Sequence, residues 1–303
     1  MKDLWNIVKA RLLYCVGRFF RGLDFPGIQR VADVLGLLMW VFLFRRREET
    51  VQRVKKHLQL TEPEARVIAK SSFINTMRSF MEIFLNTRFT DEYVHFEDRE
   101  RFEAMLDLER PSIFASAHFG SWELLASFIG KNVRRPSLSV ARQQKDKVVS
   151  EFIKNIRGES SHFAVDHREA AKPILQCLRN GGGLGVLVDH NASRQEAIFL
   201  PFLQDTAAVN VGPALLAIRA KAIVYPIFLR RDGLRNYRLS MDEPLDTTTL
   251  EGSLAEKVEQ VALFYTRAVE KKVLETPEQW LWIHRRWKTR PPAPNSEAGK
   301  SSS

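Results

Sequence analysis

Short apolar segments alternate with amphipathic segments along most of the chain, and this order restricts the fold more than any other feature. From residue 111 onward the apolar segments have the length of covered strands, and the segments between them repeat apolar residues at helical spacing. This alternation predicts an α/β fold in which helices flank a mostly parallel central sheet. We expect strands at 93–96, 113–115, 139–141, 184–189 and 222–229, a strand at 237–241 on an edge of the sheet, and helices at 101–108, 146–157, 170–178 and 253–273.

A histidine lies where the strand at 113–115 passes into a helical segment at 124–129. His118 and Glu123 would point away from each other on one continuous helix, so they can meet only if His118 lies in the loop and Glu123 in the first helical turn. Ser121 suits the N-cap position, and the electropositive helix start favours an ionised Glu123. A neutral imidazole held by a carboxylate is a base for a hydroxyl proton, although a purely structural histidine fits the pattern equally well.

Three further polar residues follow predicted elements. Arg142 comes directly after the strand at 139–141, and Arg157 ends the next helix. A guanidinium group can bind phosphate or carboxylate with two hydrogen bonds, although most arginines are simply solvated. Asp189 closes an apolar strand, at the sheet edge where open α/β folds place ligands. A buried acid needs a partner, which a nearby arginine or His190 can supply. We expect Asp189 to pair with Arg157 and to shape the site or hold a substrate, with a purely structural salt bridge to Arg157 or another arginine as the alternative.

Several other site types lack support in the sequence. His162, Asp166 and His167 lie close together, but one short segment does not make a metal ligand set. The chain has no Gly-x-Ser-x-Gly motif for a serine hydrolase, and the glycines at 181–183 lack the Lys-Ser/Thr of a phosphate-binding loop. We therefore expect neither a metal nor a cofactor.

The charge balance predicts an anionic partner. The chain has 303 residues and a formal net charge of +10, with 45% hydrophobic residues, which is enough for a large core. No zinc-finger spacing or other nucleic-acid motif occurs, so a membrane or a phosphate-bearing substrate is the better interpretation. Cys15 and Cys177 lie far apart and suggest no disulfide framework, which fits a reducing compartment.

The N-terminal segment predicts an anchor at a membrane surface. Residues 31–44 are strongly apolar, fall short of the roughly 20 residues that a bilayer crossing needs, and contain Asp33. Basic residues lie on both sides, and Trp40 suits the membrane interface. A buried core helix is the alternative. We divide the chain into a membrane-associated helical segment at 1–47, a catalytic domain at 48–290 and a disordered tail at 291–303.

Residues 276–291 form a second segment rich in tryptophan and basic residues. The spacing from Thr276 to Gln279 matches a capping box with proline at the first helical position. Three tryptophans beside four basic residues suit an interface between lipid headgroups and acyl chains. A core-packed helix with a solvated basic end is the alternative.

Taken together, these segments resemble the bacterial lipid A late acyltransferases, a family of lauroyl and myristoyl transferases that act on Kdo-lipid A precursors. The resemblance spans most of the chain, and its most specific part is the run at 277–291. The other matching residues are those at 117–123, Arg142, Arg157, Asp189, His190, Pro201, Phe202, 212–214 and 216–219. The chain departs from the family pattern at Ala141, Asp146, Lys147, Leu203, Gln204 and Asn210.

The resemblance implies an acyltransferase of the bacterial inner membrane whose site faces the cytoplasm. It also implies an acyl thioester donor on acyl carrier protein, and an anionic glycolipid acceptor of the Kdo-lipid IVA type. We expect His118 to remove the proton from an acceptor hydroxyl, Glu123 to orient His118, and the alkoxide to attack the thioester directly. Two alternatives remain: a coenzyme A-dependent acyltransferase acting on another glycolipid such as a phosphatidylinositol mannoside, and a non-catalytic peripheral membrane protein.

Overall fold

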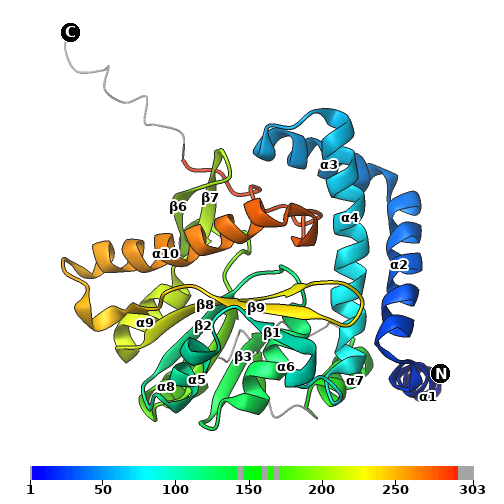
Figure 1. Ribbon diagram of the computed structural model, residues 1–303, viewed down its shortest axis with the longest axis horizontal. Coiled ribbons are helices and arrows are strands. Elements are labelled where there is room, and N and C mark those ends of the chain that lie inside the picture. Colours follow the sequence, from blue (N-terminus) through cyan, green and yellow to red (C-terminus); the bar gives the residue numbers. More distant parts are fainter. Residues whose placement is uncertain (1, 142–145, 159–162, 167–170, 293–303) are drawn as a thin grey trace.

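A mostly parallel sheet forms the centre of the protein, in a computed structural model that describes residues 2–141, 146–158, 163–166 and 171–292 (Figure 1). The strand order is β1–β9–β8–β2–β5–β3–β4, and β10 also pairs with β8. Neighbouring strands are parallel except where β9 and β10 run antiparallel to β8. The strands are β1 (Val94–Phe96), β2 (Ser112–Ser116), β3 (Ser137–Ala141), β4 (Phe163–Asp166), β5 (Gly183–Leu187), β8 (Ile223–Arg231), β9 (Tyr237–Met241) and β10 (Leu245–Asp246).

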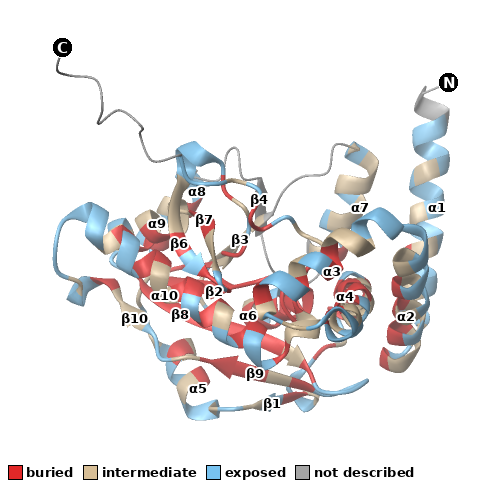
Figure 2. Cartoon of the chain, turned by 90° about the horizontal axis from the view of Figure 1, so that it is seen from above, coloured by how far each residue is buried: buried red, intermediate tan, exposed pale blue. Residues whose placement is uncertain are grey.

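Helices cover both faces of this sheet, which confirms the predicted α/β architecture. One face packs against α5 (Arg99–Asp107), α6 (Trp122–Asn132) and α7 (Lys147–Gly158); the other packs against α8 (Ala171–Arg179), α9 (Gly212–Ala220) and α10 (Leu254–Glu275). Alternate strand residues enter two separate cores, since Phe114 belongs to the first and Ile113 to the second. Figure 2 shows the buried residues gathered along the central strands between these helices.

The N-terminal part is helical and stands beside the sheet (Figure 1). It comprises α1 (Lys2–Gly22), α2 (Phe25–Phe42), α3 (Phe44–Leu58), α4 (Glu62–Met81) and the 3₁₀ turn η1 (Glu82–Leu85). Among the described residues, α2 is the one helix long and apolar enough to cross a membrane, and only 28% of it is buried. The predicted apolar helix is therefore present. Its buried side lies along α4.

Close packing and an ion pair attach α2 to α4. A Cβ atom on Gly36 would lie 2.5 Å from the Cα atom of Ile74, so the two helix backbones approach where no side chain fits. Asp33, the acid within the apolar segment, accepts two hydrogen bonds from the Arg78 guanidinium. Trp40 is half-buried and packs edge-on against Phe73, so its place at a membrane interface stays a prediction.

The prediction that β9 lies on an edge of the sheet is wrong. The short strand β1 pairs in parallel with β9 on the side away from β8, with Val94 opposite Tyr237. A separate antiparallel hairpin, β6 (Ala197–Phe202) and β7 (Asp205–Asn210), has no counterpart among the predicted elements. Four further 3₁₀ turns are η2 (Asp91–Tyr93), η3 (Arg194–Glu196), η4 (Thr247–Thr249) and η5 (Pro277–Gln279).

The tryptophan-rich C-terminal segment is part of the core and does not form the predicted membrane interface. Its helical content in the described residues is the turn η5, after which the chain runs irregularly. Trp280, Trp282 and Trp287 are buried. The indole N–H groups of Trp280 and Trp282 donate to Asp189 and to the Pro277 carbonyl, which permits their burial. Arg286 is also buried and donates to the backbone carbonyls of His190 and Ala208.

Replacing Gly36 with alanine is expected to loosen α2 from α4. The added methyl group has no space against the α4 backbone, and such overpacking typically costs about 1–3 kcal/mol. Thermal unfolding followed by circular dichroism should show a lower midpoint for Gly36→Ala. Gly22→Ala is the matched control, because a Cβ atom on Gly22 has no neighbour within 4 Å. Equal midpoints for the two variants would contradict the close packing.

Candidate active site

The carboxyl ends of two adjacent strands bring His118 and Asp189 together. β2 and β5 are parallel neighbours in register, with Ser116 opposite Leu187. His118 lies two residues beyond Ser116, and Asp189 lies two residues beyond Leu187. Both loops therefore leave the same edge of the sheet, where open α/β folds place their ligands.

Asp189 accepts hydrogen bonds from both the ring and the backbone of His118. Its Oδ1 atom lies 2.9 Å from Nδ1 of His118, and its Oδ2 atom accepts the His118 backbone N–H at 3.0 Å and the Trp280 indole N–H at 2.9 Å. A carboxylate only accepts hydrogen bonds, so Nδ1 carries the proton and Nε2 is left with its lone pair. No hydrogen bond reaches Nε2 from the described part of the chain, and the imidazole is one-quarter exposed.

The electrostatics of the pair favour an ionised acid beside an imidazole that is more basic than usual. Burial alone lowers the pKa of His118, but the charge and hydrogen bond of Asp189, with a smaller contribution from the charge of Glu123, raise the pKa above its usual value. Burial opposes ionisation of Asp189 as well. The charge and hydrogen bond of His118, the charge of His190 and the hydrogen bond from Trp280 nevertheless hold the pKa of Asp189 well below its usual value.

Backbone hydrogen bonds fasten the loop that carries His118. The His118 carbonyl accepts from the Leu281 N–H at 3.0 Å, and the Gly120 N–H donates to the Gln279 carbonyl at 2.9 Å. Gly120 has a φ of +57°, and a Cβ atom there would collide with the Leu229 carbonyl oxygen. Glycine is thus required at this position by both conformation and space.

Four of the five predicted polar residues pair differently from the expectation. Glu123 lies in the first turn of α6 as expected, but its carboxylate accepts two hydrogen bonds from Arg157 of α7, one of them at 3.0 Å. Asp189, and not Glu123, holds His118. The expected pairings of His118 with Glu123 and of Arg157 with Asp189 are therefore wrong. His118 and Glu123 do lie in the predicted loop and helical turn, but each has a partner from a distant element, α7 for Glu123 and the end of β5 for His118. Arg142 lies outside the described residues.

An apolar cavity of about 120 Å³ lies near His118 and Asp189, and its empty space rises to about 910 Å³ when the adjoining open solvent is counted. Two of its lining residues, Ser116 and Trp122, are close neighbours of His118. Small residues on one face of the sheet leave the space, and α6 covers it. In-register pairing of Ser139 and Phe114 with Gly185 places these residues side by side on that face. The cavity is lined by Ser116, Ser137, Ser139 and Gly185 from the strands, by Trp122, Leu125 and Ile129 from α6, and by Glu123 and Arg157.

The sequence carries a signal for the residues that line this cavity, although these lining residues were not predicted. Serine and glycine alternate with larger apolar residues in β3 and β5, and alternation in a strand places all the small residues on one face. Trp122 connects the cavity with the polar pair, because its ring meets the His118 imidazole edge-on with centroids 5.3 Å apart. The Trp280 contact to Asp189 was not predicted either, since no local pattern relates these distant residues.

The described residues include no group of three or more His, Cys, Asp and Glu side chains placed to hold a metal ion. His190 and His284 lie near the pair, and burial lowers the pKa of both, to about 4 for His284. His284 accepts the backbone N–H of Asn191 at 3.2 Å, and His190 contacts the Leu187 carbonyl through Nδ1. These imidazoles are thus engaged with backbone groups.

Comparison with known proteins identifies the family. The family model for bacterial lipid A biosynthesis acyltransferases matches residues 10–289. The chain is 26% identical over 277 residues to the lipid A biosynthesis lauroyltransferase of Escherichia coli (strain K12), covering 89% of this chain and 88% of that protein. It is 27% identical over 184 residues to the lipid A biosynthesis palmitoleoyltransferase of the same strain, covering 60% and 57%, respectively. The chain is therefore an enzyme, an O-acyltransferase, and it belongs to the bacterial lipid A biosynthesis acyltransferase family.

Proposed function

We propose that this enzyme transfers a fatty acyl group from an acyl carrier protein thioester to a hydroxyl group of a Kdo-lipid IVA-type precursor. The observation that carries the proposal is the His118–Asp189 pair next to an apolar cavity, whose lining residue Trp122 contacts the His118 ring. The curated relatives are lauroyl and palmitoleoyl transferases of lipid A biosynthesis, which supports a fatty acyl donor and a lipid A-type acceptor.

In the proposed reaction, Nε2 of neutral His118 takes the proton of the acceptor hydroxyl. The resulting alkoxide attacks the thioester carbonyl carbon, the carbon–sulfur bond breaks, and the leaving thiolate takes the proton back from the imidazolium. No covalent enzyme intermediate is needed. General base catalysis contributes roughly 10²–10⁴-fold, so the alignment of the two substrates supplies much of the remaining acceleration.

Asp189 has the orienting role in this proposal. It holds Nδ1 protonated, stabilises the imidazolium that forms, and fixes the ring through the backbone N–H of the same residue. Glu123 and Arg157, which hold one another, form the polar part of the cavity wall beside the reacting thioester. Arg142 directly follows β3 in the sequence, and we propose it as a further substrate-binding residue.

The cavity is the proposed site of the fatty acyl chain. Its lining is mainly apolar beyond Glu123 and Arg157, and each methylene group moved from water into such a site gains about 0.8 kcal/mol. A fatty acyl chain that lies between α6 and the sheet would place its thioester at the carboxyl ends of the strands, where His118 lies. The depth of the cavity would then set the preferred chain length.

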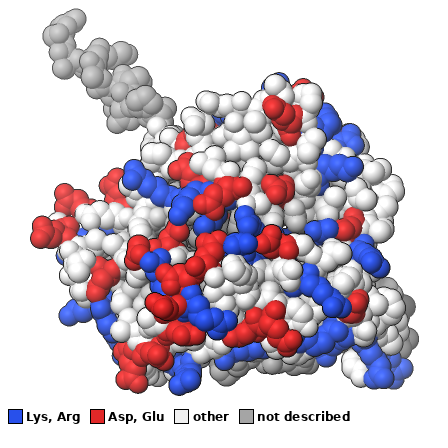
Figure 3. Space-filling view, in the orientation of Figure 1, with Lys and Arg blue, Asp and Glu red and all other residues white. Residues whose placement is uncertain are grey.

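The N-terminal helices support a location at the cytoplasmic surface of the inner membrane. Large apolar side chains are exposed on both α1 and α2: Trp5, Ile7, Val8, Leu12, Tyr14 and Phe19 on the former, and Val34, Leu37, Leu38, Val41 and Phe42 on the latter. Such surfaces are typical of membrane contact. On the face shown in Figure 3 basic and acidic side chains are interspersed, so the net charge of +10 does not form a single basic surface there.

Substitutions at the pair and at Glu123 should separate their roles. His118→Ala should abolish transfer, and Asp189→Asn should lower kcat by about 10²-fold or more, because the imidazole loses its orienting charge. Glu123→Gln should have a smaller effect. The assay measures labelled acyl transfer to a Kdo-lipid IVA acceptor from acyl carrier protein and coenzyme A thioesters in parallel.

Retained transfer by folded His118→Ala enzyme would overturn the general-base mechanism. Faster transfer from coenzyme A would overturn the proposed donor alone. A larger decrease of kcat in Glu123→Gln than in Asp189→Asn would show that Glu123, and not Asp189, orients His118.

Filling the cavity should shorten the preferred acyl chain. Gly185→Leu adds a side chain on the cavity face of β5, where a Cβ atom meets only ordinary contacts, at 3.8 Å or more. We expect tetradecanoyl transfer to fall by at least 10-fold relative to octanoyl transfer, measured by competition between the two thioesters. Val224→Leu, which adds bulk to the core on the other sheet face, is the matched control and should leave the ratio unchanged. An unchanged ratio in Gly185→Leu would place the acyl chain elsewhere.

A further inference from the structure

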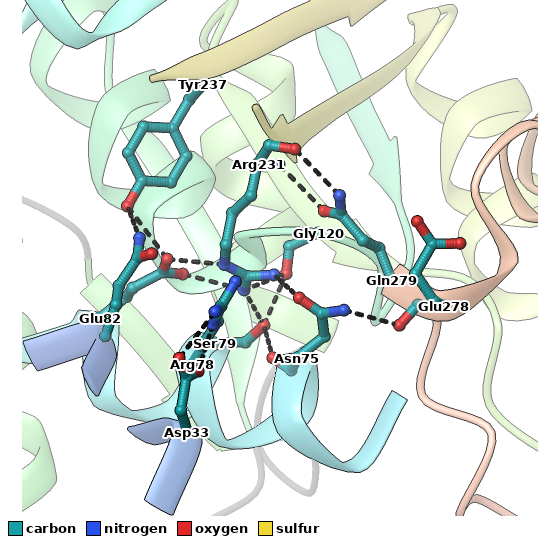
Figure 4. Close-up of polar contacts among 11 residues, drawn as sticks. Asp33, Asn75, Arg78, Ser79, Glu82, Gly120, Arg231, Tyr237, Glu278 and Gln279 are labelled. Atoms are coloured by element: carbon teal, nitrogen blue, oxygen red, sulfur yellow. Dashed lines mark hydrogen bonds and ion pairs between the residues drawn. The ribbon is translucent and has the colours of Figure 1, made fainter. Parts of the chain in front are cut away.

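A buried arginine, Arg231, lies at the end of β8 behind the loop that carries His118 (Figure 4). Its side chain is only 2% exposed. The guanidinium donates to both carboxylate oxygens of Glu82, at 2.7 and 3.0 Å, and to the Gly120 carbonyl at 2.8 Å. It also donates to the Ser79 hydroxyl and, at 3.3 Å, to the side chain of Asn75.

The partners of Arg231 are themselves fixed. Glu82 is fully buried and accepts a third hydrogen bond, from the Tyr237 hydroxyl at 3.0 Å. The Gln29 side chain of α2 in turn donates to that hydroxyl. The backbone of Arg231 exchanges two 2.9 Å hydrogen bonds with the Gln279 side chain (Figure 4). The guanidinium therefore occupies one orientation, defined by several elements at once.

Stability alone does not account for this arrangement. Burying an ion pair costs desolvation energy that its attraction often fails to recover, and apolar replacements are frequently neutral or stabilising. A guanidinium differs from them in its rigid, planar set of donors, which can hold an acceptor at a defined place. Glu82, Ser79 and Asn75 belong to α4 and η1, whereas Gly120 belongs to the loop of His118.

The Gly120 carbonyl is the point where this network meets the reaction site. Gly120 lies two residues beyond His118 in the sequence, and its carbonyl accepts hydrogen bonds from Arg231 and, at 2.6 Å, from the Ser79 hydroxyl. The Gly120 N–H is bound from the other side by the Gln279 carbonyl. Rotation of this peptide would move the His118 backbone, and with it both hydrogen bonds from His118 to Asp189.

We propose that Arg231 is a positioning residue for acyl transfer, which acts by holding the Gly120 carbonyl and so the distance between His118 and Asp189. The inference rests on the proposed general-base role of His118. Arg231 touches neither substrate. Its loss misplaces the imidazole, and a displacement of about 1 Å at a reacting group can cost about 10²-fold in rate.

Arg231→Lys and Arg231→Gln test the proposal. Per folded enzyme, kcat should fall by about 10- to 100-fold, more in the glutamine variant, while KM for both substrates stays within about twofold. A second readout is the acid limb of the pH–rate profile. If the distance between His118 and Asp189 increases, the Asp189 carboxylate stabilises the protonated imidazole less. The pKa of His118 then falls, and the midpoint of the acid limb should move to lower pH.

Arg78→Gln is the matched control. Arg78 is also a partly buried arginine of this region, but its hydrogen bonds among the described residues go to Asp33 of α2 and none reaches the loop (Figure 4). The Arg78→Gln variant should have a lower unfolding temperature, with kcat and the acid limb of the pH–rate profile unchanged. Ser79→Ala removes the second contact to the Gly120 carbonyl while leaving the Arg231–Glu82 pair, and should give a smaller change in the same direction as Arg231→Lys.

Wild-type kcat and acid limb in folded Arg231→Lys and Ser79→Ala would overturn the proposal, as would an equal loss of kcat in Arg78→Gln. If Arg231→Gln does not fold, the lysine and Ser79 variants decide the question. His118→Ala separates the two proposals. If this variant is active, the proposed general-base role of His118 is wrong. If it is inactive while the Arg231 variants are fully active, only the proposed positioning role of Arg231 is wrong.

Discussion

The hydrogen bonds that Asp189 accepts from His118 connect the fold with the chemistry. They exist because β2 and β5 are adjacent and parallel, so that their loops leave the sheet side by side. The Trp280 indole adds a third donor, and thereby ties the C-terminal segment to the same carboxylate. The buried Asp189 carboxylate thus fixes the tautomer of the His118 imidazole, the position of the His118 backbone and the path of the C-terminal segment. The charge of the same carboxylate raises the pKa of His118.

Two features surround the His118–Asp189 pair: an apolar cavity on one side and a buried hydrogen-bond network on the other. On the sheet, small residues on one face of β3 and β5 leave an apolar cavity under α6, and the cavity-lining residue Trp122 contacts His118. Behind the loop, the buried Arg231–Glu82 pair joins β8, η1 and the Gly120 carbonyl, and reaches α2 through Tyr237. The apolar helix α2 is therefore linked by hydrogen bonds to the loop of the proposed base. The N-terminal helices are thus an integral part of the enzyme's framework as well as its proposed contact with the membrane.

Much of the fold was predictable because it depends on local patterns. Alternating apolar and amphipathic segments correctly indicated a mostly parallel α/β sheet, and placed His118 and Asp189 at the ends of strands. The pairing of these two residues was not predictable, because it depends on which strands become neighbours, and no local pattern encodes that order. The β6–β7 hairpin was not predicted for a different reason: its turn residues, Leu203 and Gln204, have positive φ angles where glycine or asparagine is usual. The burial of Trp280 could not be distinguished from membrane contact, since both favour an aromatic ring with one polar atom.

The pKa of the His118 imidazole, measured by NMR titration of labelled histidine, tests the central claim most directly. The signal is assigned by its loss in His118→Gln. We predict a midpoint above the usual value of about 6.5 in the unaltered enzyme, a clearly lower midpoint in Asp189→Asn, and a smaller decrease in Glu123→Gln. A midpoint at or below 6.5 in the unaltered enzyme, or a larger decrease in Glu123→Gln than in Asp189→Asn, would contradict the claim that Asp189 sets the basicity of His118.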